Sequence, residues 1–214
     1  MTVTIRPANN DDALFLAKMM LASGRGHVSR SIWEHILGCT EQEALVFLQL
    51  LAITATPHLL HHSCYLIAEQ DGKPAASLCG YDPKTMGFDA FKKAMPEVVP
   101  ILGWSDSEHQ VALSRADKIL PSLPVYQDGA WLMDNGATQA EYRRQGVFGQ
   151  LIEAICQLGR DRGYPKAQVN LFLGNEPAIH AYQKSGFVVL EEKPDEFFEK
   201  MICAPGMLSL VKDL

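Results

Sequence analysis

A short segment in the last third of the chain, Glu141–Gly149, has the residue types of an anion-binding loop. It contains Arg143, Arg144 and Gly146 and lies between a predicted strand and a predicted helix. Amides at a helix N-terminus bind anions, glycine lets the backbone approach a ligand closely, and arginine contacts phosphate oxygens. The loop therefore predicts a phosphate or pyrophosphate site. An ordinary helix start with solvated arginines would contain the same residues, so this segment alone leaves both interpretations open.

Two common nucleotide-binding patterns are absent from the chain. It contains no GxxxxGK[ST], and it contains no GxGxxG between a strand and a helix. A P-loop and a dinucleotide-binding fingerprint are therefore excluded, and a single glycine-containing turn remains a weak motif. The meaning of the loop depends on the elements around it.

The elements that would position this loop form the most regular part of the sequence. Periodicity, capping residues and glycines predict strands at Trp131–Thr138, Ala167–Leu173, Phe187–Leu190 and Met207–Lys212, and helices at Val147–Arg162 and Asn175–Ser185. Asn175 is the expected N-cap of the second helix. The charge run Glu191–Glu196 is predicted to be a solvated loop.

The N-terminal part predicts three further strands and two helices. The strands are expected at Thr2–Arg6, Cys64–Glu69 and Pro74–Tyr81, and the helices at Ala13–Ser23 and Glu41–Ala55. Thr40 and Glu43 form a capping-box pattern before the second helix. The body of that helix is apolar nearly all round, which indicates burial or an interface and leaves a homodimer open.

Residues 82–129 have helical character, with helices expected around Gly87–Ala94 and Asp106–Leu120. Pro96 and Pro100 are expected to interrupt this segment. A long excursion between two strands is either a lid or pocket wall, or an insertion that serves packing.

The loop and the downstream helix together resemble the GNAT superfamily of N-acetyltransferases. The loop matches the family's [Q/R]-x-x-G-x-[G/A] pattern at Arg143, Gly146 and Phe148. The later segment matches N-x-x-A-x-x-x-Y-x-x-x-G-F at Asn175, Ala178, Tyr182, Gly186 and Phe187. Phe148 departs from the family's glycine or alanine, and we expect the backbone cradle to survive.

The resemblance implies an α/β (α+β) fold with a mixed, mostly antiparallel sheet flanked by helices. The sheet would be splayed between the fourth and fifth strands, and the helical insertion 82–129 would follow the third strand. A single domain, 1–214, would contain an acetyl-CoA-binding core at residues 130–190.

The resemblance also assigns site residues. Backbone groups of two strand residues would align the cosubstrate acetyl-CoA, loop amides and arginines would hold its pyrophosphate, and Asn175 would hydrogen-bond its pantetheine arm; these residues are Ala137, Thr138, Arg143, Arg144, Gln145, Gly146, Val147, Phe148, Gly149 and Asn175. Tyr182 would be the general acid toward the thiolate, because its pKa of about 10 lies near that of a thiol. Taken alone, Tyr182 would be read as a core aromatic. Asp134 is the candidate base, although strand alternation could turn it away from the cleft.

The implied function is acetyl transfer to a primary amine, most simply of a small molecule. A peptide or protein amine, a non-catalytic acyl-CoA-binding module and a dimerising scaffold are the alternatives. A formal net charge of −6 argues against nucleic-acid binding, and no apolar run is long enough to cross a membrane. Five scattered cysteines and the absence of a signal-like start favour a reduced, cytoplasmic protein. No metal site is predicted; His58, His61 and His62 are expected at a polar surface or pocket edge.

Overall fold

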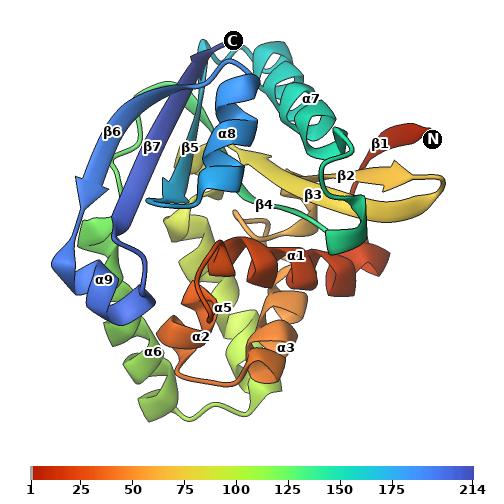
Figure 1. Ribbon diagram of the computed structural model, residues 1–214. Helices are drawn as coiled ribbons and strands as arrows, with labels where there is room; N and C mark the ends of the chain where they lie inside the picture. Colours follow the sequence, from red (N-terminus) through yellow and green to blue (C-terminus); the bar gives the residue numbers. More distant parts are fainter. Residues whose placement is uncertain (1) are drawn as a thin grey trace.

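The computed structural model describes residues 2–214 and contains one seven-stranded sheet in the order β1-β2-β3-β4-β5-β7-β6 (Figure 1). The strands are β1 Val3–Pro7, β2 Tyr65–Gln70, β3 Lys73–Tyr81, β4 Ala130–Thr138, β5 Lys166–Phe172, β6 Val188–Pro194 and β7 Gly206–Asp213. The helices are α1 Ala13–Arg25, α2 Ile32–Leu37, α3 Glu41–Leu51, α4 Pro83–Met86, α5 Phe88–Leu102, α6 Asp106–Ile119, α7 Val147–Asp161, α8 Glu176–Lys184 and α9 Glu196–Ile202. Short 3₁₀ turns occur at Asn10–Asp12, His62–Cys64, Leu120–Ser122 and Ala140–Tyr142.

The sheet has the predicted mixed topology. Every neighbouring pair of strands is antiparallel except β4 and β5, which run parallel. That parallel pair is short, because only Ala130–Met133 and Lys166–Val169 are in register. Beyond those residues β4 continues along β3 and β5 continues along β7. The predicted splay between the fourth and fifth strands is therefore confirmed.

A bulge in β4 coincides with the start of the splay. Cys79 pairs with Asp134 and Ser77 pairs with Ala137, so β4 contains one more residue than β3 between these two pairs. Asn135 adopts a left-handed conformation with φ 51°. An extra residue of this kind bends a strand and increases its twist, which directs the end of β4 away from β5.

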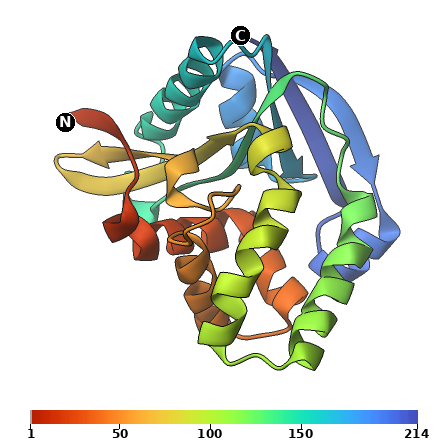
Figure 2. The same ribbon diagram turned by 180° about the vertical axis from the view of Figure 1, so that it is seen from behind.

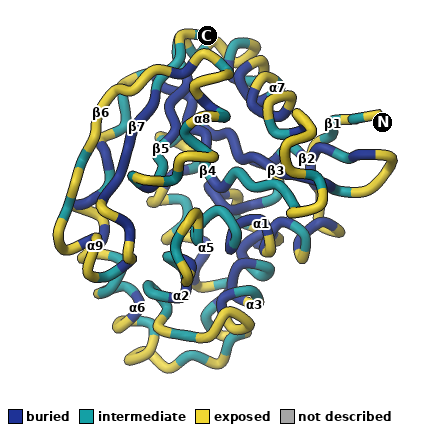
Figure 3. The backbone as a smooth tube through the Cα atoms, in the orientation of Figure 1, coloured by how far each residue is buried: buried dark blue, intermediate teal, exposed yellow. Residues whose placement is uncertain are grey.

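Helices cover both faces of the sheet and bury separate parts of the core (Figures 1 and 3). On one face α1 and α3 pack around Leu16, Phe47 and Leu48. On the other, α7 packs Leu151 and Ile155 against the strands. The apolar face of α3 thus lies largely in the protein's own core, although Val46 stays 41% exposed.

The segment between β3 and β4 contains α4, α5, α6 and a 3₁₀ turn. Contrary to expectation, Pro96 and Pro100 lie inside α5, which runs on to Leu102. Both prolines lie on the exposed side of the helix. Water can therefore hydrate the carbonyl groups that lose their helical partners, which lowers the cost of interrupting the hydrogen bonds.

Two further expectations about elements were wrong, and short helices were missed. Helix α3 ends at Leu51 rather than Ala55. The charge run is not a loop, because β6 continues to Pro194 by pairing with β7, and Glu196 begins α9. Helix α2 was missed, although Ser31 and Glu34 form a capping box that marks its start.

The histidines were also placed wrongly, since His58 and His61 are buried. His58 Nε2 lies 3.1 Å from Thr54 Oγ1, and burial lowers the pKa of His58 and of His61 to about 4. They are neutral structural groups. All five cysteines are free thiols. Within residues 2–214 no helix combines the length and the apolar character that crossing a bilayer requires.

Candidate active site

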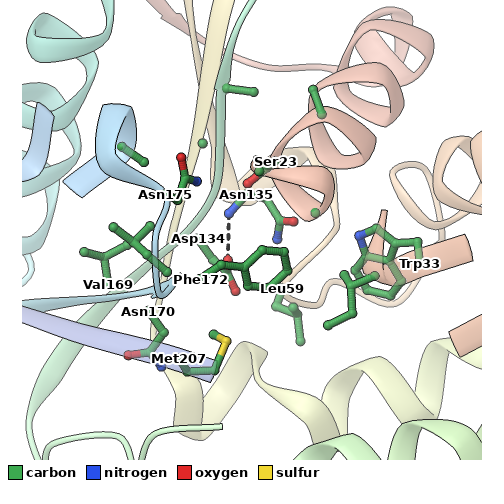
Figure 4. Close-up of a pocket in the computed structure, with 18 of the residues that line it drawn as sticks. Ser23, Trp33, Leu59, Asp134, Asn135, Val169, Asn170, Phe172, Asn175 and Met207 are labelled. Carbon is green, nitrogen blue, oxygen red and sulfur yellow. Dashed lines mark hydrogen bonds between the residues drawn. The ribbon is translucent and has the colours of Figure 1, made fainter. Parts of the chain in front are cut away.

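The fork between β4 and β5 opens into a cavity of about 1530 Å³. Asp134 and Asn170, the first residues beyond the paired parts of the two strands, line it together with the loop 143–149 and one face of α8. Figure 4 shows Asp134 and Asn135 at the fork, with Asn170 on the β5 side and Asn175 where the chain enters α8. The two segments that the sequence singled out therefore border one cavity.

The loop before α7 presents a run of free backbone donors. Within residues 2–214, the amides of residues 144–149 make no backbone hydrogen bond, and α7 starts at Val147 without a side-chain cap. Arg144 and Gly146 have φ of 60° and 80°, so the backbone curls around one point. Consecutive amides in such a turn, at the positive end of a helix, form an anion site.

The space beside this loop fits a ligand. A Cβ placed on Gly146 or Gly149 would meet nothing within 4 Å. The loop therefore leaves room directly over its free amides, which suits the pyrophosphate of a coenzyme A ester. The residues fit the implied cosubstrate here through backbone donors rather than through a packed side-chain pocket.

Two side chains of the loop, those of Arg143 and Gln145, make hydrogen bonds to nearby backbone carbonyl groups. Arg143 Nε donates to the carbonyl oxygen of Thr138 at 3.2 Å, which holds the guanidinium against the end of β4. Gln145 does not line the cavity, since its side chain bonds Gln70 and the carbonyl oxygen of Glu141. Gln145 thus offers a backbone amide only.

Phe148, the departure from the family pattern, is accommodated by a glycine across the cavity wall. A Cβ on Gly136 would lie 2.7 Å from Phe148 Cζ, so the ring rests on the bare backbone of β4. The same ring meets Tyr182 edge to face, with centroids 5.8 Å apart. The bulky side chain lies on β4 and leaves the loop amides free.

Tyr182 is buried and lines the cavity from α8. Phe148 and Phe187 hold its ring by edge-to-face contacts, the second with centroids 5.4 Å apart. Burial raises the pKa of its phenol well above the ordinary value, and the nearby Asp134 charge raises that pKa further. The hydroxyl therefore stays protonated throughout the physiological range, but its pKa lies above the value near that of a thiol that the sequence led us to expect.

Asp134 faces the cavity, so the expectation that alternation could turn it away does not apply. Asn135 N–H donates to Asp134 Oδ1 at 2.8 Å within the bulge. Burial raises the pKa of Asp134 to about 6, and the hydrogen bond from Asn135 only partly offsets this. A carboxylate with that pKa is ionised at pH 7 and is a stronger base than an ordinary aspartate.

Asn175 occupies the N-cap position of α8, as predicted, but its side chain makes no capping hydrogen bond. Its side chain instead reaches Gly26 at the end of α1, where a Cβ would lie 3.1 Å from Asn175 Nδ2 and 3.1 Å from Phe172 Cδ2. Gly26 lets the turn after α1 approach the end of β5 closely. That approach closes the cavity on this side.

The sequence profile of the acetyltransferase (GNAT) family matches residues 30–187. The chain belongs to this family. GNAT membership makes it an N-acetyltransferase and agrees with the β4–β5 fork, the amide-rich loop and the position of α8. A comparison with curated proteins gave no match.

Solved structures share the fold of this GNAT chain at low identity. An N-acetyltransferase from Staphylococcus aureus Mu50 has a TM-score of 0.68 at 19% identity, over 98% of this chain and 100% of that one. A Drosophila melanogaster polyamine N-acetyltransferase, described as forming N-acetylagmatine, has a TM-score of 0.55 at 15% identity over 100% of both chains. Ard1 from Thermoplasma volcanium has a TM-score of 0.56 at 13% identity, over 100% of this chain and 99% of that one.

The sequence offered residues 82–129 as a pocket wall, but it did not identify the residues that line the part of the GNAT cavity beyond Asp134. Its wall comes from α2, α5, α6 and the ends of α1 and β5. The missed residues are mostly apolar and aromatic: Trp33, Phe47, Leu59, Phe88, Phe91, Met95, Trp104, Leu113, Tyr126 and Phe172. Such residues look like ordinary core in a sequence. The carboxylate of Glu69 on β2 lies outside the cavity, paired with Arg6 at 2.7 Å.

Proposed function

We propose that this protein transfers an acetyl group from acetyl-CoA directly to a primary amine, with Asp134 as base and Tyr182 as acid. The observation that carries the proposal is one cavity that holds a basic carboxylate, a protonated phenol and a run of free amides. Amides of residues 144–149 would bind the pyrophosphate, assisted by Arg143 and Arg144. Ala137, Thr138 and Asn175 would hold the pantetheine arm.

Acetyl-CoA would supply a thioester carbonyl at which the amine nitrogen forms the new N–C bond while the C–S bond breaks. Asp134 first takes one proton from the ammonium, which frees the nitrogen lone pair. Tyr182 gives its proton to the departing sulfur, and the second proton that the nitrogen loses as the amide forms restores the phenol by way of solvent. The sum is one amide, one thiol and one released proton, so no covalent enzyme intermediate is needed.

The Asp134 assignment predicts an acid limb in the pH profile. The pKa of Asp134 is about 6. Its negative charge acts on the pKa of five nearby groups: Tyr65, Tyr81, Tyr126, Tyr182 and Cys79. Burial raises the pKa of each of these five groups, so all of them are neutral between pH 5 and 8. The kcat/KM should therefore fall below about pH 6, where Asp134 becomes protonated.

The test is acetylation of a panel of amines, followed by thiol detection across pH, for the wild type and Asp134→Asn. We expect the variant to lose about 100- to 10,000-fold in kcat/KM, the usual share of a general base, while acetyl-CoA affinity by calorimetry is unchanged. An unaltered acid limb in Asp134→Asn would remove Asp134 from the mechanism. Tight acetyl-CoA binding without turnover of any amine would make the protein a binding module instead.

A further inference from the structure

The cavity extends well past the fork, between the two long helices of the inserted segment. Helix α5 turns Phe88, Phe91 and Met95 toward it, at positions three and four residues apart on one helix face. Helix α6 turns Ala112, Leu113 and Ala116 toward it in the same way, and Leu120 of the following 3₁₀ turn also lines it. We refer to this extension, between α2, α5 and α6, as the distal chamber.

The distal chamber stays open because the two helices pack on other elements. Helix α5 packs on α3 and α4, and α6 packs on α2. Figure 2 shows them side by side, as the yellow-green and the green helix, connected by a loop at their lower ends. On the cavity face of α6, Ala112 and Ala116 are small, which keeps the space between the two helices unfilled.

Aromatic rings form the wall of the distal chamber. Phe47 stacks on Trp104 with centroids 5.7 Å apart at 11°, and Trp33 lies next to Phe47 at 6.4 Å. Phe88 is 38% exposed although it borders the cavity. Apolar surface left in contact with water inside a cavity favours an apolar ligand.

Carboxylate and ammonium groups are confined to the two ends of this space, and His109 places an imidazole beside Trp104 on its α6 wall. Asp134 lies at the inner end, where Figure 4 shows Phe172 and Leu59 beside it and Trp33 farther out. Lys92 and Asp117 are exposed and also line a second, outer groove between α5 and α6. The aromatic middle contains no carboxylate that could bind a second cationic group.

We propose that the acceptor is a small primary amine attached to an aromatic or bulky apolar group. Its ammonium binds at Asp134, and its apolar part fills the distal chamber. This assignment rests on the acetyl transfer proposed above. A diamine or polyamine would place a second charge among Phe88, Trp104 and their neighbours, where it would lose hydration without a partner. The helices α5 and α6 thus select the acceptor by the apolar group that is attached to its amine.

Steady-state kinetics with matched amines test this selection. Phenethylamine, butylamine and putrescine are compared at saturating acetyl-CoA. Burying a phenyl ring is expected to raise kcat/KM for phenethylamine about 30- to 100-fold over butylamine, and putrescine should be poorer still. Equal values, or a preference for putrescine, would overturn the assignment. A peptide N-terminus that outperforms phenethylamine would replace the small molecule with a peptide.

Phe88→Asp tests the chamber itself. Phe88 is the first residue of α5, where a carboxylate favours the helix dipole, so the variant should fold. We expect at least a 10-fold loss of kcat/KM for phenethylamine and a smaller loss, or a gain, for putrescine. Val111→Asp is the control, since Val111 is 49% exposed on α6 and lies outside the cavity. Equal effects of the two substitutions on both amines would contradict the proposal.

A binding measurement separates the two proposals. Trp33 and Trp104 line the chamber, so phenethylamine should change tryptophan fluorescence saturably in the wild type and weakly in Phe88→Asp. Binding without turnover of any amine would reject the acetyl transfer and keep the apolar site. Turnover of all amines at similar rates, without such binding, would reject the chamber alone.

Discussion

The two ends of the cavity are built in different ways. The end near α7 and α8 depends on backbone: free amides at residues 144–149, a bulge at Asn135 and glycines at 136 and 146. The distal chamber depends on side chains that arrive from α2, α3, α5 and α6. On the functions proposed above, backbone donors would bind the part of the ligand that every reaction shares, and side chains would fit one acceptor. Cosubstrate binding and acceptor choice would then depend on separate parts of the structure.

This division predicts that changes at the first end affect all acceptors alike, whereas changes in the chamber affect them unequally. Each prediction below probes the first end or the fork, where the two ends meet. A substitution at the end of the cavity near α7 and α8 that altered the preference among acceptors would contradict this division.

The largest effect is expected from Tyr182→Phe. The phenyl ring keeps the contacts with Phe148 and Phe187, so the fold and the acetyl-CoA affinity should change little. Loss of the proton donor should lower kcat by about 100- to 10,000-fold, and by the same factor for phenethylamine and butylamine. Rapid-quench and steady-state kinetics measure this. Unchanged kcat for both amines would return Tyr182 to the role of a core aromatic.

Asp134→Asn should stabilise the protein at neutral pH. The pKa of Asp134 is about 6 in the folded protein against an ordinary 3.8, so the folded state binds more protons between these values and loses stability as pH rises through them. The difference corresponds to at most about 3 kcal/mol at pH 7.5, less where water in the cavity screens the charge, and to about 1 kcal/mol at pH 4.5.

Chemical denaturation of wild type and Asp134→Asn at the two pH values measures this gain. Asp128→Asn is the control and should lower the stability instead of raising it, since the ion pair with Lys84 lowers the pKa of exposed Asp128. A gain that does not shrink toward pH 4.5 would show that ionisation of Asp134 is not its cause. Loss of activity together with gain of stability would identify Asp134 as a residue kept for chemistry.

The backbone end could be predicted from the sequence because its signals are local. Gly146 and the arginines occur in one turn, and Asn175, Ala178 and Tyr182 repeat along one helix. Even there the sequence missed one long-range feature: that Gly136 would accommodate Phe148. It also predicted a capping role for Asn175, whose side chain in fact reaches Gly26 across the cavity.

The chamber could not be predicted in this way, because its residues come from segments far apart in the sequence. Trp33, Phe88 and Trp104 have the composition of core, and only the packing of α5 on α3 and of α6 on α2 leaves them bordering a cavity. Prolines in α5 added to the difficulty, since Pro96 and Pro100 suggested a break where the helix continues. Local patterns predict the elements, and the space between them depends on tertiary packing.

The smallest predicted effect tests whether the loop acts through its backbone. Gly146 and Gly163 lie just outside the two ends of α7, with φ of 80° and 83° and open space around each missing Cβ. Valine should therefore strain both positions by a similar amount, about 1–2 kcal/mol. Only Gly146→Val places methyl groups over the free amides, so it should weaken acetyl-CoA binding by about 10-fold beyond Gly163→Val, as calorimetry would measure. Relative rates with phenethylamine and butylamine should stay the same in both variants, because neither touches the distal chamber. Equal acetyl-CoA affinity in the two variants would mean that the pyrophosphate binds elsewhere, and the backbone would then lose its role as the shared part of the site.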